Sequence, residues 1–269
     1  MRFICPISGI RFYRISTDDG LDLAVPGVTS ILADDEPKEN RERLEQWKQR
    51  EIAAGRDPDA GRIRGSAVHA VLEDHIRGIR EAPESQEVAA YASGMERHLE
   101  DYDKFLWSER PLVKGWEHCW SERDEKNERL ARVWSAIWGA AGTPDLIARD
   151  RRGLISLDDF KSAAKPYFRC SGSPVPLHLM NSWLKYKRTV RQLCAYKLMA
   201  EETLGIEIDR LRIIVGLPEE GKSQLFTLNR CEIAAETEAF KRMCVAFWQR
   251  QARRNAAGLE AAAAGAAAA

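Results

Sequence analysis

The sequence predicts an α/β fold in which a central mixed β-sheet is flanked by helices. Two hairpin patterns, over residues 142–162 and 211–228, consist of Leu- and Ile-rich runs joined by polar turns. Apolar residues at helical spacing lie before and between them, over residues 66–80, 85–108 and 189–204. The chain has 269 residues, of which 44% are hydrophobic and 30% are charged, so it can bury one substantial core.

One elaborated domain is expected over residues 1–255. Residues 256–269 are nearly all Ala and Gly, a low-complexity tail that is not expected to be part of the folded domain. The six cysteines are scattered without a C-x-x-C pair, which favours reduced thiols over disulfides, a zinc site or an iron–sulfur cluster.

Net charge and hydropathy limit the classes of partner. Lys plus Arg and Asp plus Glu both total 41, so any basic surface for a polyanion must be local. No apolar run approaches the ~20 residues of a membrane span, and the N-terminus lacks the pattern of a secretory signal. An intracellular, cytoplasmic protein with no membrane partner is expected.

The N-terminal third should begin with short strands over residues 10–15, 21–25 and 26–32. A charged helix follows and runs to about Ala54, because Pro37 suits a first helical turn. Its inner side is expected to carry Leu44, Trp47 and Ile52.

The next predicted helix carries a candidate metal ligand. It spans about Ser66 to Arg80, and its buried stripe is Val68, Leu72, Ile76 and Ile79. His69 and Glu73, four residues apart, lie at the border of this stripe, where a histidine can reach into a cleft. In isolation, the pattern fits a half-buried packing histidine better than a ligand.

A long helix is predicted for residues 85–108, with a core-facing stripe of Val88, Tyr91, Met95, Leu99, Tyr102 and Leu106. A strand is predicted for Trp116 to Trp120, and it carries Glu117 and His118.

The hairpin over residues 142–162 brings charged groups together. Side chains alternate along a strand, so Asp159 and Lys161 share one side while Asp158 points to the other. Asp145 lies on the neighbouring strand, and Mg²⁺ typically binds one or two such carboxylates plus substrate phosphates. A lysine beside them can orient or deprotonate water and counter charge that builds up on a phosphate. Taken alone, the pattern is explained about equally well by an acidic strand end with a lysine on the protein surface.

An irregular segment of about 25 residues is predicted after Lys161, because Gly172, Pro174 and Pro176 interrupt regular structure. Basic side chains interleaved with aromatic ones suit single-stranded nucleic acid, although the aromatics can equally well anchor the loop. The residues concerned are Lys165, Tyr167, Phe168, Arg169, Trp183, Lys185, Tyr186, Lys187 and Arg188.

The helix over 189–204 holds Gln192 and Tyr196 one turn apart. After the second hairpin, Asn229 and Glu232 form a capping-box pattern at the start of a last helix, which is expected to end near Arg254.

Several of these motifs resemble those of a known superfamily. Pro144-Asp145 followed by Asp159-Phe160-Lys161 resembles the signature of the PD-(D/E)xK nucleases. The run from Arg64 to His69 and the Gln192/Tyr196 pair resemble the first and last motifs of its RecB-like branch. Val28-Thr29-Ser30-Ile31-Leu32 adds a closer resemblance to the mitochondrial genome maintenance exonucleases and their phage and bacterial relatives. The long segment after Lys161 departs from that pattern and leaves the substrate path open.

The resemblance implies a restriction-endonuclease-like core with helical and loop insertions, and Mg²⁺- or Mn²⁺-dependent hydrolysis of phosphodiester bonds. By this resemblance, the metal ligands are His69, Asp145, Asp159 and the carbonyl of Phe160. Lys161 positions the nucleophile, while Gln192 and Tyr196 support the site. In some relatives a glutamate on the preceding strand lies near the site, and Glu117 is the loosely aligned candidate.

The expected activity is that of a DNA exonuclease in repair, recombination or replication, acting on DNA that is single-stranded or has free ends. Two alternatives stay open: a structure-selective endonuclease on the same core and a catalytically silent nucleic-acid-binding subunit. The presence of Asp145, Asp159 and Lys161 argues against a catalytically silent subunit. The residues expected to contact nucleic acid are Arg64, Ser66, Lys165, Tyr167, Arg169, Lys185, Lys187 and Arg188.

Overall fold

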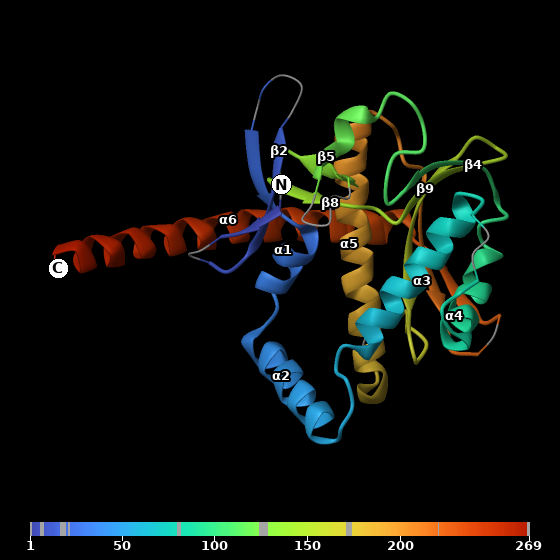
Figure 1. Ribbon diagram of the computed structural model, residues 1–269, viewed down its shortest axis with the longest axis horizontal. Helices are drawn as coiled ribbons and strands as arrows, with labels where there is room; N and C mark the ends of the chain where they lie inside the picture. Colours follow the sequence, from blue (N-terminus) through green and yellow to red (C-terminus); the bar gives the residue numbers. More distant parts are fainter. Residues whose placement is uncertain are drawn as a thin grey trace.

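A five-stranded mixed sheet lies at the centre of the protein (Figure 1). The structure is a computed structural model that describes residues 2–5, 8–16, 20, 22–79, 82–123, 129–170, 174–219 and 221–267. The strands, in spatial order, are β12 (Ser223–Thr227), β11 (Arg210–Gly216), β10 (Ile155–Ser162), β9 (Leu146–Asp150) and β4 (Tyr102–Ser108). Only the β10/β11 pair within this sheet is parallel. Both predicted hairpins and the predicted mixed α/β sheet are confirmed.

Helices cover both faces of this sheet. A parallel pair needs a crossover connection, and α5 (Met180–Leu204) supplies it between β10 and β11. On that face, α6 (Arg230–Ala267) packs against α5, whereas α3 (Ala60–Ile76) and α4 (Gln86–Glu96) cover the opposite face. Because side chains alternate along β10, Leu157 packs in the α5 core and Phe160 packs in the α3/α4 core.

The smaller elements surround this layered core. Near the N-terminus, β1 (Arg2–Ile4), β2 (Arg11–Ser16) and β3 (Asp22–Pro26) form a three-stranded sheet. The others are α1 (Val28–Asp34), α2 (Lys38–Ala53), the 3-10 turns η1 (Glu117–Cys119) and η2 (Leu177–Leu179), and the strand pairs β5 (Trp120–Arg123) with β6 (Arg129–Ala131) and β7 (Val133–Ser135) with β8 (Ala140–Gly142). In the part of the chain that the structure describes, no helix has the length and apolar character to cross a membrane.

The predicted helix over residues 85–108 is wrong in its second half. Helix α4 ends at Glu96, and Tyr102–Ser108 is strand β4, which pairs with the edge of β9. The spacing of Leu99, Tyr102 and Leu106 fits a helix, but the backbone of β9 needs a partner and aromatic residues favour strands. The core assignment holds for Val88, Tyr91, Met95, Leu99 and Tyr102, which are all buried.

Two predicted strands are short helices instead. Residues Val28–Asp34 form α1, which buries Val28, Ile31 and Leu32 at helical rather than alternating spacing. The strand predicted from Trp116 to Trp120 is replaced by η1, because Gly115 has a φ of 95° and its amide donates to the Glu117 carboxylate at 2.8 Å. This local turn competes with an extended backbone.

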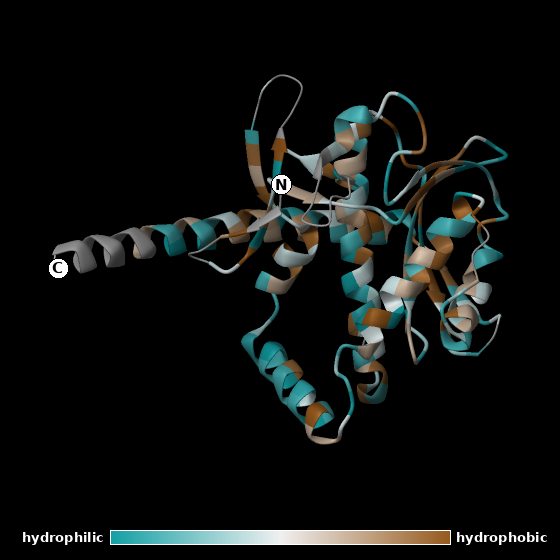
Figure 2. Ribbon diagram, viewed as in Figure 1, coloured by the Kyte–Doolittle hydropathy of each residue, from teal (hydrophilic) through white to brown (hydrophobic). Residues whose placement is uncertain are grey.

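Helix α2 forms as predicted but has no inner side. None of its residues is buried, and Leu44, Trp47 and Ile52 are 50%, 40% and 64% exposed. Figure 2 shows α2 as predominantly hydrophilic, in contrast to the brown strands and helix faces of the core. Helix α2 has many charged residues and too few apolar ones to form an apolar face that packs against the core.

Three helix boundaries also differ. Helix α3 begins at Ala60 instead of Ser66 and ends at Ile76, so Ile79 lies beyond it. Helix α5 begins at Met180, which makes the last third of the predicted irregular segment helical. Helix α6 starts with the predicted capping box, in which Asn229 and Glu232 exchange side-chain to backbone hydrogen bonds, but it continues past Arg254 to Ala267.

Candidate metal centre

The β9/β10 hairpin places three charged residues, Asp145, Asp159 and Lys161, close together. Asp158 of β10 pairs with Leu146 of β9, so Asp145 immediately precedes β9 beside the middle of β10. Asp159 and Lys161 share a side as predicted, and the Lys161 Nζ lies 2.5 Å from the Asp159 Oδ2. The Asp145 carboxylate accepts a hydrogen bond of 2.7 Å from the backbone amide of Phe160.

Asp159 is the most deeply buried of these groups. Its side chain is 1% exposed, and neither oxygen has a hydrogen-bond donor of suitable geometry despite the close ammonium of Lys161. Burial raises the pKa of Asp159 to about 6; the charge of Lys161 opposes this rise and the charge of Asp145 adds to it. Although burial alone would lower the pKa of Lys161, Asp159 and Asp145 raise it, so the lysine remains a cation.

His69 reaches this cluster from α3. Its Nε2 donates to the Phe160 carbonyl at 3.0 Å, while its Nδ1 lies 3.6 Å from an Asp145 oxygen and 3.5 Å from a Glu109 oxygen. Burial alone would lower the pKa of His69, but the two carboxylates raise it to about 9. Its position at the border of the buried stripe, beside Val68 and Leu72, is as predicted.

Glu109 is the residue of the cluster that sequence analysis missed. It follows β4 directly, and its amide donates to the Asp145 carbonyl at 3.1 Å. Among the residues that the structure describes, it is the one non-glycine with a positive φ, 51°, a strained conformation of the kind that concentrates at functional sites. The hydrogen bond and the charge of His69 lower the pKa of Glu109.

The available signal for Glu109 was its place at the end of an aromatic run, Tyr102 to Ser108. A helix over this run does not predict that Glu109 is near Asp145. The two residues come together only because β4 pairs with β9. Glu117, the predicted candidate, lies in η1, where its carboxylate accepts from Gly115.

This donor set fits a hard divalent cation. His69, Glu109 and Asp145 each offer a ligand atom, and these atoms lie within 4.8 Å of one another. The Phe160 carbonyl accepts a hydrogen bond from His69. Asp159, a predicted ligand, is not part of this group of three, but its charge interacts with those of Asp145 and His69. Carboxylate and carbonyl oxygens suit Mg²⁺ and Mn²⁺.

Gln192 and Tyr196 lie on α5 beside these carboxylates. The Gln192 amide donates to the Tyr196 hydroxyl at 2.9 Å, and the tyrosine is 6% exposed. Burial, together with the charges of Asp145 and Asp159, raises the pKa of Tyr196, so the phenol stays neutral. Its ring packs against Gly142, where an added Cβ would lie 2.4 Å from the Tyr196 Cε1. The glycine therefore allows the ring to approach the site.

The residues predicted to contact nucleic acid fall into two groups. Ser66, Lys165, Lys185 and Arg188 are exposed, although Arg188 also lies 3.5 Å from Glu36. The others make internal contacts: Arg64 with Glu87, Arg169 with Glu232, Lys187 with Glu236, and Tyr167 through its buried ring and a backbone bond to Gln224.

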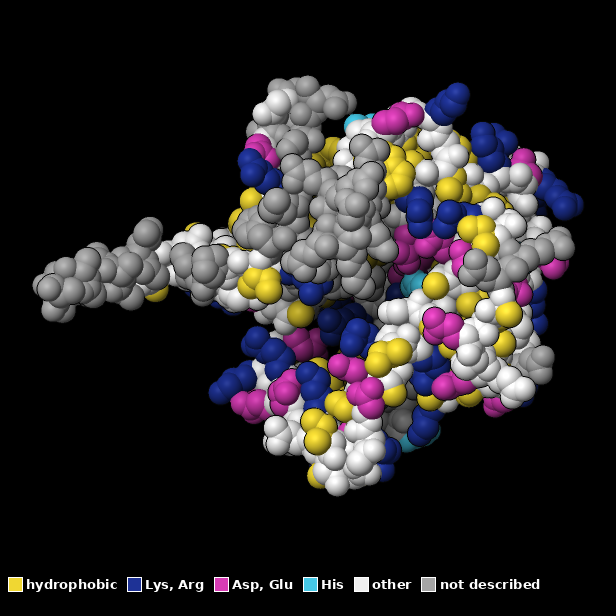
Figure 3. All heavy atoms as spheres, viewed as in Figure 1, with side chains coloured by type: hydrophobic (Ala, Val, Ile, Leu, Met, Phe, Trp, Pro, Cys, Tyr) yellow, Lys and Arg dark blue, Asp and Glu magenta, His cyan; other side chains and the backbone are white. Residues whose placement is uncertain are grey.

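Charged side chains of both signs line a hollow in one face of the molecule (Figure 3). Figure 3 shows acidic and histidine side chains recessed in one face of the molecule, with Lys and Arg side chains gathered above them and across the hollow. An anionic strand can thus be attracted locally, although the net charge of the chain is zero.

The sheet, its hairpin carboxylates, the adjacent lysine and the nearby histidine define a protein of the metal-dependent nuclease class. The model of the PD-(D/E)XK nuclease superfamily matches residues 40–268, and the chain belongs to that superfamily. No curated protein matches the chain. Residues 1–39, which include β2, β3 and α1, precede the matched region.

Proposed function

We propose that the protein is a Mg²⁺- or Mn²⁺-dependent deoxyribonuclease that degrades single-stranded DNA from its ends, in DNA repair, recombination or replication. The observation that carries the metal-dependent chemistry is the group formed by His69, Glu109 and Asp145, whose ligand atoms lie within 4.8 Å of one another beside the buried Asp159–Lys161 ion pair. Carboxylates this close together repel one another, and a bound cation removes that repulsion.

In the proposed reaction, His69, Glu109, Asp145, Asp159 and the Phe160 carbonyl would hold the cation. A cation bound there would supply polarisation of the scissile phosphate and activation of the attacking water. The Lys161 ammonium, 2.5 Å from Asp159, stabilises negative charge that develops on the phosphate. Gln192 fixes the Tyr196 hydroxyl at the edge of the carboxylates, where the neutral phenol can donate to a phosphate oxygen.

The proposed DNA contacts follow the two groups of basic residues. The exposed Ser66, Lys165, Lys185 and Arg188 contact the strand directly. Arg64, Tyr167, Arg169 and Lys187 support this surface, because their bonds to Glu87, Gln224, Glu232 and Glu236 hold α3, the segment after Lys161 and the start of α5 in place.

One assay tests the proposed activity. End-labelled linear and closed circular single-stranded DNA are incubated with purified protein in Mg²⁺ or in Mn²⁺, and the Asp145→Ala variant is the matched control. We expect metal-dependent loss of linear strands, survival of circles and no cleavage by the variant. Efficient cutting of circles would favour the endonuclease alternative, and absence of any cleavage by the wild type in either metal would contradict the proposal.

A further inference from the structure

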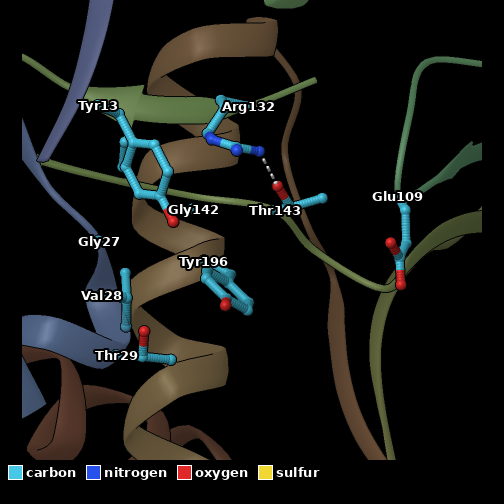
Figure 4. Close-up of a pocket in the computed structure, with 10 residues that line it drawn as sticks. Tyr13, Gly27, Val28, Thr29, Glu109, Arg132, Gly142, Thr143 and Tyr196 are labelled. Atoms are coloured by element: carbon cyan, nitrogen blue, oxygen red, sulfur yellow. Dashed lines mark hydrogen bonds between the residues drawn. The ribbon is translucent and has the colours of Figure 1, made fainter. Parts of the chain in front are cut away.

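A cavity of about 290 Å³ adjoins the metal centre on the side of the N-terminal sheet. Figure 4 shows Glu109 at one end and Tyr13 at the other, with Arg132 and Thr143 between them and Thr29 on the opposite wall. Tyr196 also lines it, so the cavity shares two residues with the site described above. Its volume is at the lower end of the roughly 300–1,000 Å³ that small-molecule sites occupy, which suits one small group.

A nearly buried guanidinium forms part of the cavity wall. Arg132 is 8% exposed, and its Nη1 donates to the Thr143 hydroxyl at 2.7 Å and to the Ala131 carbonyl at 3.0 Å. The guanidinium also lies over the Tyr13 ring, 4.3 Å from its centroid. These contacts hold the guanidinium plane in one orientation, and a preorganised arginine fork is well suited to phosphate oxygens.

The remaining lining is also suited to an anion. The cavity walls carry the hydroxyl groups of Tyr13 and Thr29, whereas the Thr143 hydroxyl donates to the Ala131 carbonyl at 2.9 Å and so holds Arg132 in place. Glu109, the acidic member, lies at the end shared with the metal centre (Figure 4). Backbone forms another part of the wall, where Gly27 bridges to Ala141 and a Cβ on Gly27 would lie 3.0 Å from the Tyr13 ring. The absence of a side chain on Gly27 thus allows the Tyr13 ring to lie against this wall.

A second cavity shares one lining residue, Thr29, with the first. It has a volume of about 590 Å³ and is lined by Arg11, Arg41 and Arg254 together with Asp34, with which Arg254 is paired. Arginine side chains therefore line both cavities.

We propose that the Arg132 cavity is a subsite for a phosphate group of the substrate strand next to the phosphate that is cleaved. This inference rests on the proposed nuclease function and adds where the strand lies. The wall that contains Tyr13 and Thr29 belongs to residues 1–39, ahead of the superfamily match, so this chain's own N-terminal segment completes the subsite. The group bound is either an internal phosphodiester or a terminal phosphomonoester.

The test uses single-stranded oligonucleotides in which one phosphate at a time is replaced by an uncharged methylphosphonate. Their binding is measured by fluorescence anisotropy in Ca²⁺ buffer, for the wild type, Arg132→Gln and Arg132→Lys. We expect one position, adjacent to the scissile bond, at which the replacement weakens wild-type binding about tenfold or more. The replacement at that position should have little effect in Arg132→Gln and an intermediate effect in Arg132→Lys.

A second set of oligonucleotides distinguishes the two sources of the phosphate. Strands with a 5′-phosphate, a 3′-phosphate or only hydroxyl ends are compared. If the terminal group occupies the subsite, removing one terminal phosphate should weaken wild-type binding but not that of Arg132→Gln. If an internal phosphodiester occupies it, the end groups should have no effect and only the internal scan should respond.

Controls separate this proposal from a folding defect and from the proposed function. Arg132→Gln should keep the Mn²⁺ affinity of the wild type. Arg151→Gln removes an exposed charge from the turn between β9 and β10, and it should show the same dependence of binding on the position of the methylphosphonate as the wild type. An identical scan for the wild type and Arg132→Gln would overturn the subsite while leaving the nuclease assignment intact. A wild type that neither binds nor cleaves single strands would overturn both.

Discussion

Asp158 and Asp159 are neighbours in the chain but have opposite surroundings. Asp159 faces the metal centre, while Asp158, fully buried on the other face, accepts from Tyr102 at 2.6 Å, Ser156 at 2.7 Å and Arg212 at 2.8 Å. The predicted strand alternation is confirmed by these contacts. Asp158 is thus a structural residue, and the two aspartates allow function and stability to be tested separately.

Asp159→Asn should weaken Mn²⁺ binding and cleavage together, because a charged oxygen is lost from the metal centre. Asp158→Asn should keep Mn²⁺ affinity. It should lower the free energy of unfolding by about 3 kcal/mol, because the buried Arg212 guanidinium loses the negative charge of Asp158 with which it is paired. Calorimetric titration with Mn²⁺ and urea denaturation measure the two effects. Loss of Mn²⁺ affinity in a folded Asp158→Asn variant would show that the assigned strand faces are wrong.

Glu109 and Glu117 form a second matched pair. Glu109→Gln should lower Mn²⁺ affinity by at least about tenfold, because even residues that merely contact metal ligands commonly alter affinity 10–100-fold. Glu117→Gln should have no effect, as this carboxylate interacts with Gly115 instead. Equal Mn²⁺ affinities for the two variants in calorimetry would remove Glu109 from the ligand set.

At the scale of secondary-structure elements, close packing of α4 on β11 depends on Gly216. An added Cβ there would lie 2.4 Å from the backbone carbonyl of Tyr91 and 3.2 Å from the Met95 side chain. Backbone atoms in a helix cannot rotate away as a side chain can, so α4 would have to shift. Helix α3, which carries His69, packs against α4. A shift of α4 would therefore also affect the position of His69 in the metal centre.

Gly216→Ala should therefore lower the free energy of unfolding by about 1–3 kcal/mol, the usual cost of overpacking a core. Gly61→Ala is the control: Gly61 lies in the first turn of α3 and its nearest neighbour is an Arg64 nitrogen at 3.8 Å. The control should unfold at an unchanged or slightly higher denaturant concentration, because Ala favours helix more than Gly does. Urea denaturation of the two variants in parallel decides the point.

A buried ion pair connects α1 with α6. Asp34 is 6% exposed at its side chain and accepts hydrogen bonds from Arg250 at 2.6 Å and Arg254 at 2.7 Å. Burial alone would raise the pKa of Asp34, but the two arginines lower it overall. The contact holds the N-terminal segment, and with it the wall of the Arg132 cavity, against the rest of the protein.

Because the pKa of Asp34 is lower in the folded than in the unfolded protein, its contribution to stability is present above the unfolded pKa of about 3.9. It is lost as the pH falls through the folded pKa. The wild type should thus be more stable than Asp34→Asn near neutral pH, and this difference should shrink below about pH 4. Thermal unfolding of both proteins across this range measures it, and a constant difference would contradict the assignment.

At the scale of the whole molecule, cores on both faces of one sheet favour a single cooperative unit, as proposed for residues 1–255. The residues by which α6 enters the core, Phe240, Cys244 and Phe247, and the buried Gln251 all precede residue 256. Figure 1 shows the C-terminal end of this helix extending away from the other elements.

A chain shortened after Asn255 should keep the unfolding temperature and Mn²⁺ affinity of the full chain. Its far-ultraviolet circular dichroism and tryptophan fluorescence should report one coincident transition, because the two cores share the central sheet. A lower unfolding temperature would show that the last turns of α6 add stability. Two separate transitions would instead contradict the single domain.

The sequence by itself determined what depends on local periodicity. Alternation along β10 placed Asp159 and Lys161 on one face and Asp158 on the other, and helical spacing placed His69 beside the stripe of Val68 and Leu72. The two hairpins and the capping box at Asn229 also follow from neighbours in the chain. Periods of two and 3.6 residues are properties of the backbone and need no distant partner.

Only the tertiary structure decided the pairings between distant segments. Glu109 joins the metal centre because β4 pairs with β9, and Tyr13 meets Arg132 because the N-terminal sheet lies against β8. The segment Tyr102–Ser108 has apolar spacing that fits a helix as well as a strand, and the unpaired edge of β9 resolves the ambiguity. Whether such a segment forms a helix or a strand depends on which backbone groups are still unpaired and which apolar surfaces are still exposed after the local elements have formed. Both depend on the fold as a whole.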